Sequence, residues 1–307
     1  MNLLHTMDGL RLIPPGATVS IGNFDGIHVG HAEILRQARQ LASGQAVGVI
    51  TFEPHPMTVL RPNHVPPRLT DLHRKRELLE SAGVDYLVEL APTPDVLGLS
   101  AERFWEIIRD EVRPNHLIEG VDFRFGKGRR GNIDLLRDWS AQSDVQLHVL
   151  EDVEATLLDQ HVVPVSSSLI RWLVGNGRMR DAAICLGRPY VLTGVVVEGF
   201  RRGRELGIPT ANLLVSGQAI PMEGVYAGKC SIGAKTYSAA ISVGKPPTFE
   251  AAEFQIEAHL MGFDGDLYGQ TLNLEIRDWV RDQRKYSNVE ALKEQMNRDL
   301  QSIGSRP

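Results

Sequence analysis

Residues 17–41 read ATVSIGNFDGIHVGHAEILRQARQL. The first five residues form a short apolar run that is typical of a buried strand, and residues 31–41 place Leu and Ile at the spacings of one buried helix face. Between them, Gly22, Gly26 and Gly30 let backbone N–H groups approach a phosphate, and the N-terminus of the following helix adds a partial positive charge. The stretch therefore predicts a strand, a phosphate-binding loop and a helix.

Two histidines, His28 and His31, flank Gly30 at the end of this loop. At that spacing both can point at one phosphate, where negative charge grows on the phosphoryl oxygens during in-line attack at an α-phosphorus. Donors already in place there lower the barrier without reorganisation. Surface histidines at a helix N-terminus and a metal-binding pair remain open as alternatives, although no third ligand and no His-Glu-x-x-His pattern accompanies the two.

Strand-like and helix-like segments alternate through the first half of the chain. Short apolar runs predict strands at residues 17–21, 46–52, 86–90, 117–118 and 145–150. Spacings of three and four predict helices at residues 31–41, 71–81, 102–111 and 133–139. This alternation predicts a doubly wound parallel α/β sheet.

The sequence pattern changes near residue 187, where the alternation with helix-like segments stops. Strand-like runs separated by Gly, Pro and Asp turns follow at residues 191–197, 224–232, 236–243, 254–261 and 271–276. They predict a compact β-barrel or β-sandwich, of which we expect an antiparallel barrel. A final helix is predicted at residues 288–300, with Asn288 as N-cap and an apolar stripe of Val289, Leu292, Met296 and Leu300. We therefore expect domains at residues 1–186 and 187–307, the border following two short helical stretches.

Composition limits the possible functions. The 307 residues include 42% hydrophobic and 23% charged residues, which is typical of a folded globular protein. With 33 basic and 38 acidic residues, the net charge of -5 predicts neither a nucleic-acid partner nor a membrane partner. Two distant cysteines and the lack of a leader or apolar span predict a cytoplasmic protein.

A second glycine-rich stretch, residues 194–213, reads GVVVEGFRRGRELGIPTANL. Its glycines Gly199, Gly203 and Gly207 recur every four residues in a strand-turn-strand setting, which suits a flap close to a nucleotide. Thr210 and Asn212 then stand one residue apart along a strand, so that their oxygens can point to one side as hard ligands for Mg²⁺.

Further motifs occur in a recognisable order. They are TFEPHP at 51–56, GVDFRFG at 120–126, SSLIR at 167–171, GVYA at 224–227, PTF at 247–249 and EAHL at 257–260. In order and spacing, the chain resembles the bacterial bifunctional riboflavin kinase/FMN adenylyltransferase (FAD synthetase) family over essentially its whole length. The resemblance implies ATP as co-substrate, Mg²⁺ as cofactor, and riboflavin, FMN and FAD as substrates and products.

For the first domain, the resemblance implies that His28 and His31 face the ATP phosphates and that Asp122 lies near the substrates. It also implies a phosphate clamp of Ser167, Ser168 and Arg171. The remaining nucleotide-binding residues implied are Gly22, Phe24, Asp25, Gly26 and Gly30. On the residues alone, the Ser-Ser pair can equally be a helix cap, and Glu53 with His55 can be a polar cluster at a strand end.

For the second domain, the resemblance implies that Thr210 and Asn212 bind Mg²⁺-ATP and that Glu257 accepts the proton of the ribityl 5′-hydroxyl. The flap glycines would lie near the nucleotide. Pro246 stands where many relatives carry Arg, which affects the expected flavin contacts.

Some residue patterns suggest other functions. The segment from Asp264 to Glu275 nearly fits an EF-hand loop, but Tyr268 occupies a ligand position, so a β-turn is expected. A single-activity nucleotidylyltransferase with a ligand-binding barrel and a non-enzymatic flavin- or RNA-binding module are the competing hypotheses. We expect two activities, because Thr210, Asn212 and Glu257 occur together.

Overall fold

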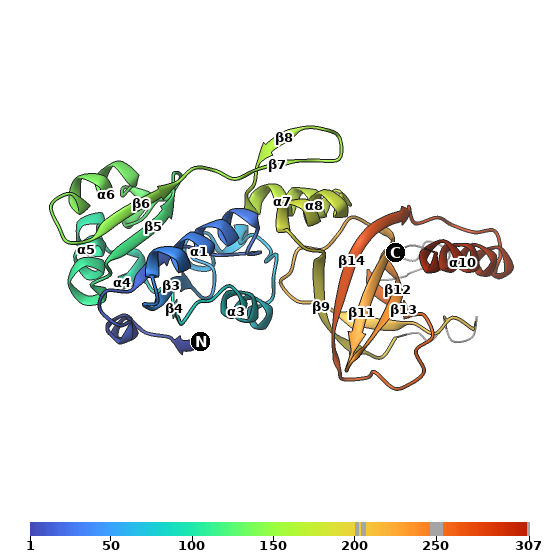
Figure 1. The fold of residues 1–307 in the computed structure, drawn as a ribbon. Helices are drawn as coiled ribbons and strands as arrows, with labels where there is room; N and C mark the ends of the chain where they lie inside the picture. Colours follow the sequence, from blue (N-terminus) through green and yellow to red (C-terminus); the bar gives the residue numbers. More distant parts are fainter. Residues whose placement is uncertain (200–202, 204–206, 246–253, 306–307) are drawn as a thin grey trace. The chain divides into compact units, whose positions relative to one another are not determined.

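The computed structural model describes residues 1–199, 203, 207–245 and 254–305. Pro246, the departure noted above, lies outside the described residues. The chain forms two compact units, each with its own sheet (Figure 1). The first unit comprises Met1–Pro66 and Leu72–Glu154, and the second comprises Pro67–Asp71 and Ala155–Pro307.

The first unit contains a six-stranded sheet in the order β1-β4-β3-β2-β5-β6. Every pair in it is parallel. The strands are β1 (Asn2–Leu4), β2 (Thr18–Ile21), β3 (Val47–Phe52), β4 (Tyr86–Leu90), β5 (His116–Gly120) and β6 (Gln146–Leu150). The predicted parallel α/β sheet is confirmed. Strand β1 was not predicted, because three residues are too short to show a period.

Helices cover both faces of this sheet. They are α1 (Val29–Ala42), α2 (Met57–Leu60), α3 (Leu72–Ser81), α4 (Pro94–Leu97), α5 (Ala101–Glu106) and α6 (Ile133–Ser140), with 3₁₀ turns at Met7–Leu12, Pro62–His64 and Lys127–Arg129. The predicted helix at 102–111 is α5 continued by π-helical Ile107–Val112. Val49 of β3 belongs to the same core cluster as Leu35 of α1 and Leu79 of α3. The next residue of β3, Ile50, belongs to a different core cluster, which contains Trp105 of α5. Adjacent residues of β3 therefore face opposite layers.

The strand order places a topological switch point between β2 and β5. From β2 the chain adds β3 and then β4 on one side, and it later returns to add β5 and β6 on the other. In open α/β sheets, ligands bind beyond the carboxyl ends of the strands at such a point. The glycine-rich loop that follows β2 lies at this position.

The second unit contains a closed barrel in the order β10-β13-β12-β11-β14-β9. Its strands are β9 (Tyr190–Val197), β10 (Ala211–Leu214), β11 (Gly224–Ile232), β12 (Lys235–Gly244), β13 (Gln255–Leu260) and β14 (Thr271–Arg281). The predicted antiparallel barrel is confirmed. Before it stand the hairpin β7 (Glu154–Thr156) and β8 (Val162–Pro164) and the helices α7 (Ser167–Gly175) and α8 (Met179–Leu186).

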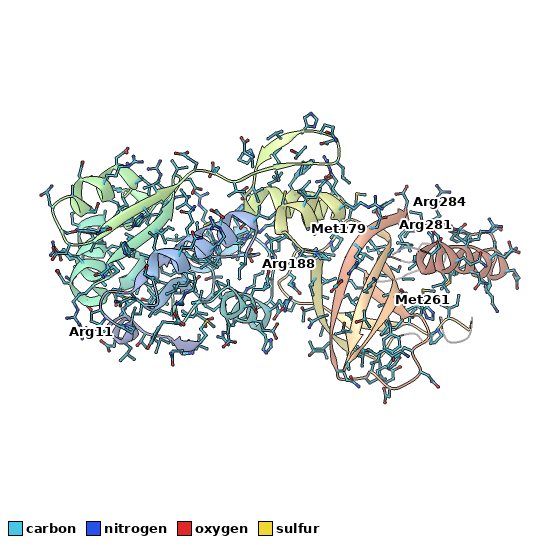
Figure 2. The ribbon with its side chains drawn as sticks, viewed as in Figure 1. Arg11, Met179, Arg188, Met261, Arg281 and Arg284 are labelled. Atoms are coloured by element: carbon cyan, nitrogen blue, oxygen red, sulfur yellow. The ribbon has the colours of Figure 1, made fainter. Side chains whose placement is uncertain are left out.

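The last helix is α10 (Val289–Gly304), and Asn288 caps it by accepting a hydrogen bond from the Ala291 N–H at 2.8 Å, as predicted. The predicted stripe is wrong at its first residue, because Val289 is 46% exposed. Instead, Asp299 is buried and forms an ion pair with Arg281 at the end of β14, at 2.8 Å. Figure 2 labels Arg281 beside the C-terminal end of this helix. Burial of Asp299 is tolerated because its charge is paired.

The acidic segment between β13 and β14 is a turn. The Tyr268 N–H donates to Asp266 Oδ1 at 2.9 Å, and strands flank the segment on both sides. The β-turn interpretation is confirmed, since an EF-hand needs flanking helices.

Candidate active sites

The loop between β2 and α1 has an unusual backbone. Phe24 (φ 46°) and Ile27 (φ 40°) are in the left-handed region without being glycine, and Gly26 (φ 82°) lies between them. Both side chains are buried in the core cluster that contains Leu35 and Val49. Core packing therefore holds a backbone that L-residues rarely adopt, a form of strain that is common at ligand-binding loops.

The two predicted histidines meet at the start of α1. His28 is the N-cap, and its Nδ1 accepts a hydrogen bond from the His31 N–H at 3.4 Å. The two rings stack with centroids 3.7 Å apart and an angle of 18°. An acceptor Nδ1 leaves the proton of neutral His28 on Nε2, which is therefore a donor. Any Cβ on Gly30 would lie 3.2 Å from His28 Nδ1, so this position favours glycine.

A buried lysine of α3 donates hydrogen bonds to the same loop and to the end of β3. Lys75 of α3 is 6% exposed, and its Nζ donates to the Asn23 carbonyl at 2.7 Å and to Thr51 Oγ1 at 2.9 Å. Thr51 Oγ1 also donates to the Asn23 carbonyl, at 3.2 Å. Lys75 is not among the site residues predicted from the sequence. The available signal is its position four residues before buried Leu79, on the apolar face of α3.

The motif near residue 55 lies beside this loop. His55 Nε2 is 3.3 Å from Asn23 Nδ2, and His55 Nδ1 accepts a hydrogen bond from the Met57 N–H at 3.1 Å. The structure thus brings the polar cluster at the end of β3 next to the loop after β2. This contact is compatible both with a polar cluster at the strand end and with a role of the motif at 51–56 in the nucleotide site.

At the switch point, a side chain continues the pairing of β2 with β5. Glu119 Oε1 accepts a hydrogen bond from the Ile21 N–H at 2.8 Å, and Glu119 is only 2% exposed. Burial raises the pKa of the Glu119 carboxyl well above its usual range; the Ile21 N–H opposes that shift, and the negative charge of Asp122 adds to it. The predicted residue Asp122 is exposed in the turn after β5. Glu119 was missed, because a Glu inside a strand is usually a solvated residue.

The Ser-Ser pair begins α7 in the second unit. Ser166 is the N-cap, and its hydroxyl accepts a hydrogen bond from the Leu169 N–H at 3.2 Å. The helix-cap interpretation is therefore wrong for Ser167 and Ser168, which occupy the first two helical positions. Backbone N–H groups there have no partner within the helix. One turn later, Arg171 Nε donates to the Pro67 carbonyl at 2.7 Å.

In the barrel, the predicted metal ligand and the predicted base are neighbours. Asn212 of β10 is the direct cross-strand partner of Glu257 of β13. On β13, Ile256 and Ala258 are buried in the barrel, and Glu257 alternates with them. Asn212 and Glu257 therefore project from the same outer face, about 5 Å apart at Cβ.

The flap glycines pack against the predicted metal ligands. A Cβ on Gly199 would collide with the side-chain amide of Asn212. A Cβ on Gly203 would lie 2.5 Å from the Ile208 carbonyl oxygen and 3.0 Å from Thr210 Oγ1. Gly207 has a φ of +79°, and nothing lies close to its Cβ position. Gly199 thus leaves space for the Asn212 side chain, Gly203 leaves space for the Ile208 carbonyl and the Thr210 side chain, and Gly207 adopts a backbone conformation that favours glycine.

A histidine anchors the residue before Thr210. His259 Nδ1 lies 2.7 Å from the Pro209 carbonyl, just beyond the last ladder pair, Ala211 with Ala258. Because a carbonyl only accepts, His259 donates from Nδ1. The motif EAHL contained this residue, but its partner is 50 positions away and no local pattern indicates it.

The oxygens of Thr210 and Asn212 are the donor type that Mg²⁺ prefers. In the described ranges, no three His, Cys, Asp or Glu side chains gather as a metal cage. Mg²⁺ characteristically uses one or two protein oxygens together with substrate phosphates. The residues therefore fit magnesium that arrives with a nucleotide.

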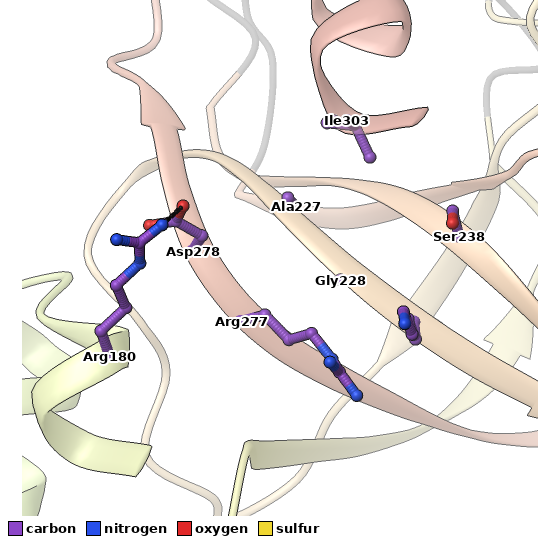
Figure 3. Close-up of a pocket in the computed structure, with 8 residues that line it drawn as sticks. Arg180, Ala227, Gly228, Ser238, Arg277, Asp278 and Ile303 are labelled. Carbon is purple, nitrogen blue, oxygen red and sulfur yellow. Dashed lines mark hydrogen bonds and ion pairs between the residues drawn. The ribbon is translucent and has the colours of Figure 1, made fainter. Parts of the chain in front are cut away.

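A hollow of about 250 Å³ lies elsewhere on the second unit. Figure 3 shows Arg180 of α8 paired with Asp278 of β14 at its edge, with Ile303 of α10 opposite. Its lining comprises Arg180, Ala227, Gly228, Lys229, Ser238, Arg277, Asp278 and Ile303. None of the predicted site residues is among them.

Comparisons with known proteins agree with the order of the two units. The FAD synthetase family model matches residues 11–167, and the riboflavin kinase family model matches residues 186–305. The bifunctional riboflavin kinase/FMN adenylyltransferase of Escherichia coli K12 is 32% identical over 97% of this chain and 96% of its own. The Bacillus subtilis 168 protein with the same name is 31% identical over 93% and 90%.

A solved structure named as a macrolide-efflux protein from Streptococcus pneumoniae has the same fold, with a TM-score of 0.88 and 28% identity over all of both chains. Among the described residues, no helix has the length and apolar character needed to cross a membrane.

The parallel sheet and the barrel, matched by the FAD synthetase and riboflavin kinase family models, define a two-domain transferase. With both family models matched in the same order, the chain belongs to the bifunctional riboflavin kinase/FMN adenylyltransferase family.

Proposed function

We propose that the two sites divide the two reactions of this family between them. The chain is an enzyme of flavin cofactor biosynthesis, with riboflavin kinase and FMN adenylyltransferase activities. It phosphorylates riboflavin with ATP to give FMN, and it transfers AMP from ATP to FMN to give FAD and pyrophosphate. The observation that carries the assignment of sites is the cross-strand pairing of Asn212 with Glu257 under the flap glycine Gly199.

In the kinase reaction, the ribityl 5′-oxygen forms a bond to the γ-phosphorus and the bond to the ADP oxygen breaks. Glu257 orients this hydroxyl and accepts its proton, and Thr210 and Asn212 hold Mg²⁺ through oxygen atoms. Bound magnesium neutralises charge on the phosphates. Gly199, Gly203 and Gly207 line the nucleotide side of the site. The packing of the first two glycines on the metal ligands supports these roles.

In the adenylyl transfer, a phosphate oxygen of FMN attacks the α-phosphorus of ATP and pyrophosphate leaves. His28 and His31 donate hydrogen bonds to the phosphoryl oxygens as charge develops there. No strong general base is needed, because a phosphomonoester with a second pKa near ~6 is largely dianionic at neutral pH. The stacked rings at the start of α1 support this role.

The remaining assignments for adenylyl transfer follow the resemblance. Asp122 lies near the substrates, and Ser167, Ser168 and Arg171 bind ATP phosphates through helix N–H groups, hydroxyls and a guanidinium. The backbone around the loop glycines completes the nucleotide site, with Gly22, Phe24, Asp25, Gly26 and Gly30. The left-handed conformation of that loop supports its specialised use.

We further propose domains at residues 1–186 and 187–307 and a cytoplasmic location. The riboflavin kinase match begins at residue 186, which supports this border, although the compact second unit begins earlier, at Ala155, and includes α7 and α8. The two cysteines, Cys185 and Cys230, are free thiols, in keeping with a reducing compartment.

The test is a timed incubation of the pure protein with riboflavin, ATP and Mg²⁺, with separation of the flavins. The expected course is FMN first and FAD second. Glu257→Gln should abolish FMN formation, and His31→Ala should block only the step from FMN to FAD. Matched controls are Glu290→Gln on exposed α10 and His73→Ala, whose side chain is 84% exposed on α3; both should behave as the unmodified chain.

Other outcomes separate the competing hypotheses. Conversion of added FMN without any action on riboflavin would favour a single-activity nucleotidylyltransferase. Tight flavin binding with no conversion of riboflavin or FMN would favour a flavin-binding module and overturn the assignment.

A further inference from the structure

The ladder between β2 and β5 stops before the strands end. Backbone pairing joins Thr18 with His116 and Val19 with Leu117. Two residues further along each strand, the Ile21 N–H donates to the side chain of Glu119 at 2.8 Å instead of to a backbone carbonyl. A carboxyl group therefore occupies the position where the strands separate at the switch point.

Ile21 is the last residue before the loop that carries the histidines. The other side of β2 is held by backbone bonds, since Gly22 N–H donates to the Ile50 carbonyl at 3.0 Å. On the side of β2 where the backbone pairing with β5 has ended, Glu119 supplies the hydrogen bond to Ile21. Its bond fixes the point from which the loop leaves the sheet.

The surroundings of Glu119 determine its charge. Within the described part of the chain, its hydrogen-bond partner is the Ile21 N–H, and no cation lies within ion-pair distance of it. The charged group that acts on it is Asp122, whose charge is also negative. Its cross-strand partner on β6 is the apolar Val149. A buried carboxylate with one neutral donor is unstable, so the group holds its proton.

We propose that Glu119 is a positioning residue for adenylyl transfer, holding the Ile21 amide and the start of the nucleotide loop as a neutral carboxylic acid. This inference rests on the proposed role of that loop in binding ATP. The neutral form has a functional consequence, because a carboxylate at this point would repel the phosphates that the loop binds. The raised pKa of Glu119 agrees with the neutral form.

The test compares Glu119→Gln with Glu119→Leu. Gln copies the protonated acid, since its carbonyl oxygen accepts from Ile21 and its second group is a neutral donor. Leu fills the space but accepts nothing. The kinase activity of the same polypeptide serves as an internal control for concentration and folding of the barrel.

For FMN adenylylation, Glu119→Gln should keep kcat and the ATP KM within about threefold of the unmodified enzyme at neutral pH. Glu119→Leu should raise the ATP KM at least tenfold with a smaller change in kcat, and the riboflavin kinase kinetics should not change in either variant. A Gln variant as impaired as the Leu variant would show that the negative charge is required. Normal ATP KM in the Leu variant would show that the bond positions nothing. Either result overturns the proposal.

A melting experiment detects a Leu variant that fails to fold, and in that case the Gln variant alone decides between the neutral acid and the carboxylate. Calorimetric titration with ATP, in an Asn212→Ala background that weakens the kinase site, gives a readout without flavin. If the unmodified chain makes no FAD, the proposed function fails. The ATP affinities of the two Glu119 variants still decide the positioning role.

Discussion

Asn212 on β10 and Glu257 on β13 stand directly opposite each other in the antiparallel ladder of the barrel. Their side chains share the outer face, while the flanking residues Ile256 and Ala258 fill the barrel. This cross-strand pair thus sets the distance between Asn212, the proposed oxygen ligand for magnesium, and Glu257, the proposed carboxylate base. A rigid sheet holds such a pair more precisely than two loops can.

The first prediction concerns Gly199, which packs against Asn212 of this pair. Gly199→Ala should reduce riboflavin kinase activity at least tenfold, because the new methyl group collides with the Asn212 amide. FMN adenylylation should be unchanged. The matched control is Gly175→Ala, at the end of α7 with nothing near its Cβ position. Steady-state kinetics of both reactions check the prediction, and equal loss of both activities would contradict it.

The second prediction concerns the stacked histidines. Gly30→Ala should lower kcat/KM for FMN adenylylation about tenfold, because the added Cβ lies 3.2 Å from the His28 ring and must displace it. Gln40→Ala, an exposed change on the same helix, should have no effect. The measurement is FAD formation from added FMN. A normal rate in the Gly30 variant would mean that ring placement does not matter.

Lys75→Met is expected to destabilise the first unit by about 2 kcal/mol, because the buried Thr51 Oγ1 loses its lysine donor and the Asn23 carbonyl loses one of its two donors. The ATP KM for adenylylation should rise, since the loop loses its support. Urea unfolding and kinetics measure the two effects. The exposed change Arg36→Met on α1 is the control, and equal stability of the two variants would argue against the role of Lys75.

Stability should depend on pH through Glu119, whose pKa is raised in the folded state by burial. The unfolded chain loses this proton near pH ~4.3, so between that value and the folded pKa the folded state binds more protons. Unfolding free energy from this group therefore falls as pH rises, by up to about 1.4 kcal/mol per pH unit in that window. Glu119→Gln removes the dependence.

The measurement is urea unfolding of the unmodified chain and of Glu119→Gln at several pH values. The variant should gain stability relative to the unmodified chain as pH rises from about 4.5 toward 7. A difference that stays constant with pH would show that Glu119 ionises normally.

The two thiols should be inert in the native protein. Burial raises the pKa of the Cys230 thiol to about 11 and also raises that of Cys185. A thiol reagent at pH 8 should therefore modify neither residue until the chain is unfolded, because the thiolate is the reactive form. Mass spectrometry before and after denaturation checks this, and rapid modification of the folded chain would contradict it.

Much of this protein can be predicted from local patterns. The spacing of apolar residues identified the parallel sheet, the barrel and α10, because each pattern repeats within a few residues of itself. The motif around Gly30 located a loop whose histidines do meet in the structure. Boundaries differed by a few residues for the long elements, whereas the short strands β1, β7 and β8 were not predicted and β10 was expected only as a strand around Asn212.

The sequence by itself therefore determined the longer elements, their order and the family, since these depend on neighbours along the chain. Only the tertiary structure decided which side chains support the sites. Glu119 meets Ile21 across 98 positions, Lys75 meets Asn23 across 52, and His259 meets Pro209 across 50. A buried polar group is stable only beside its partner, and strand order and register bring those partners together. Local periodicity carries no information about that pairing.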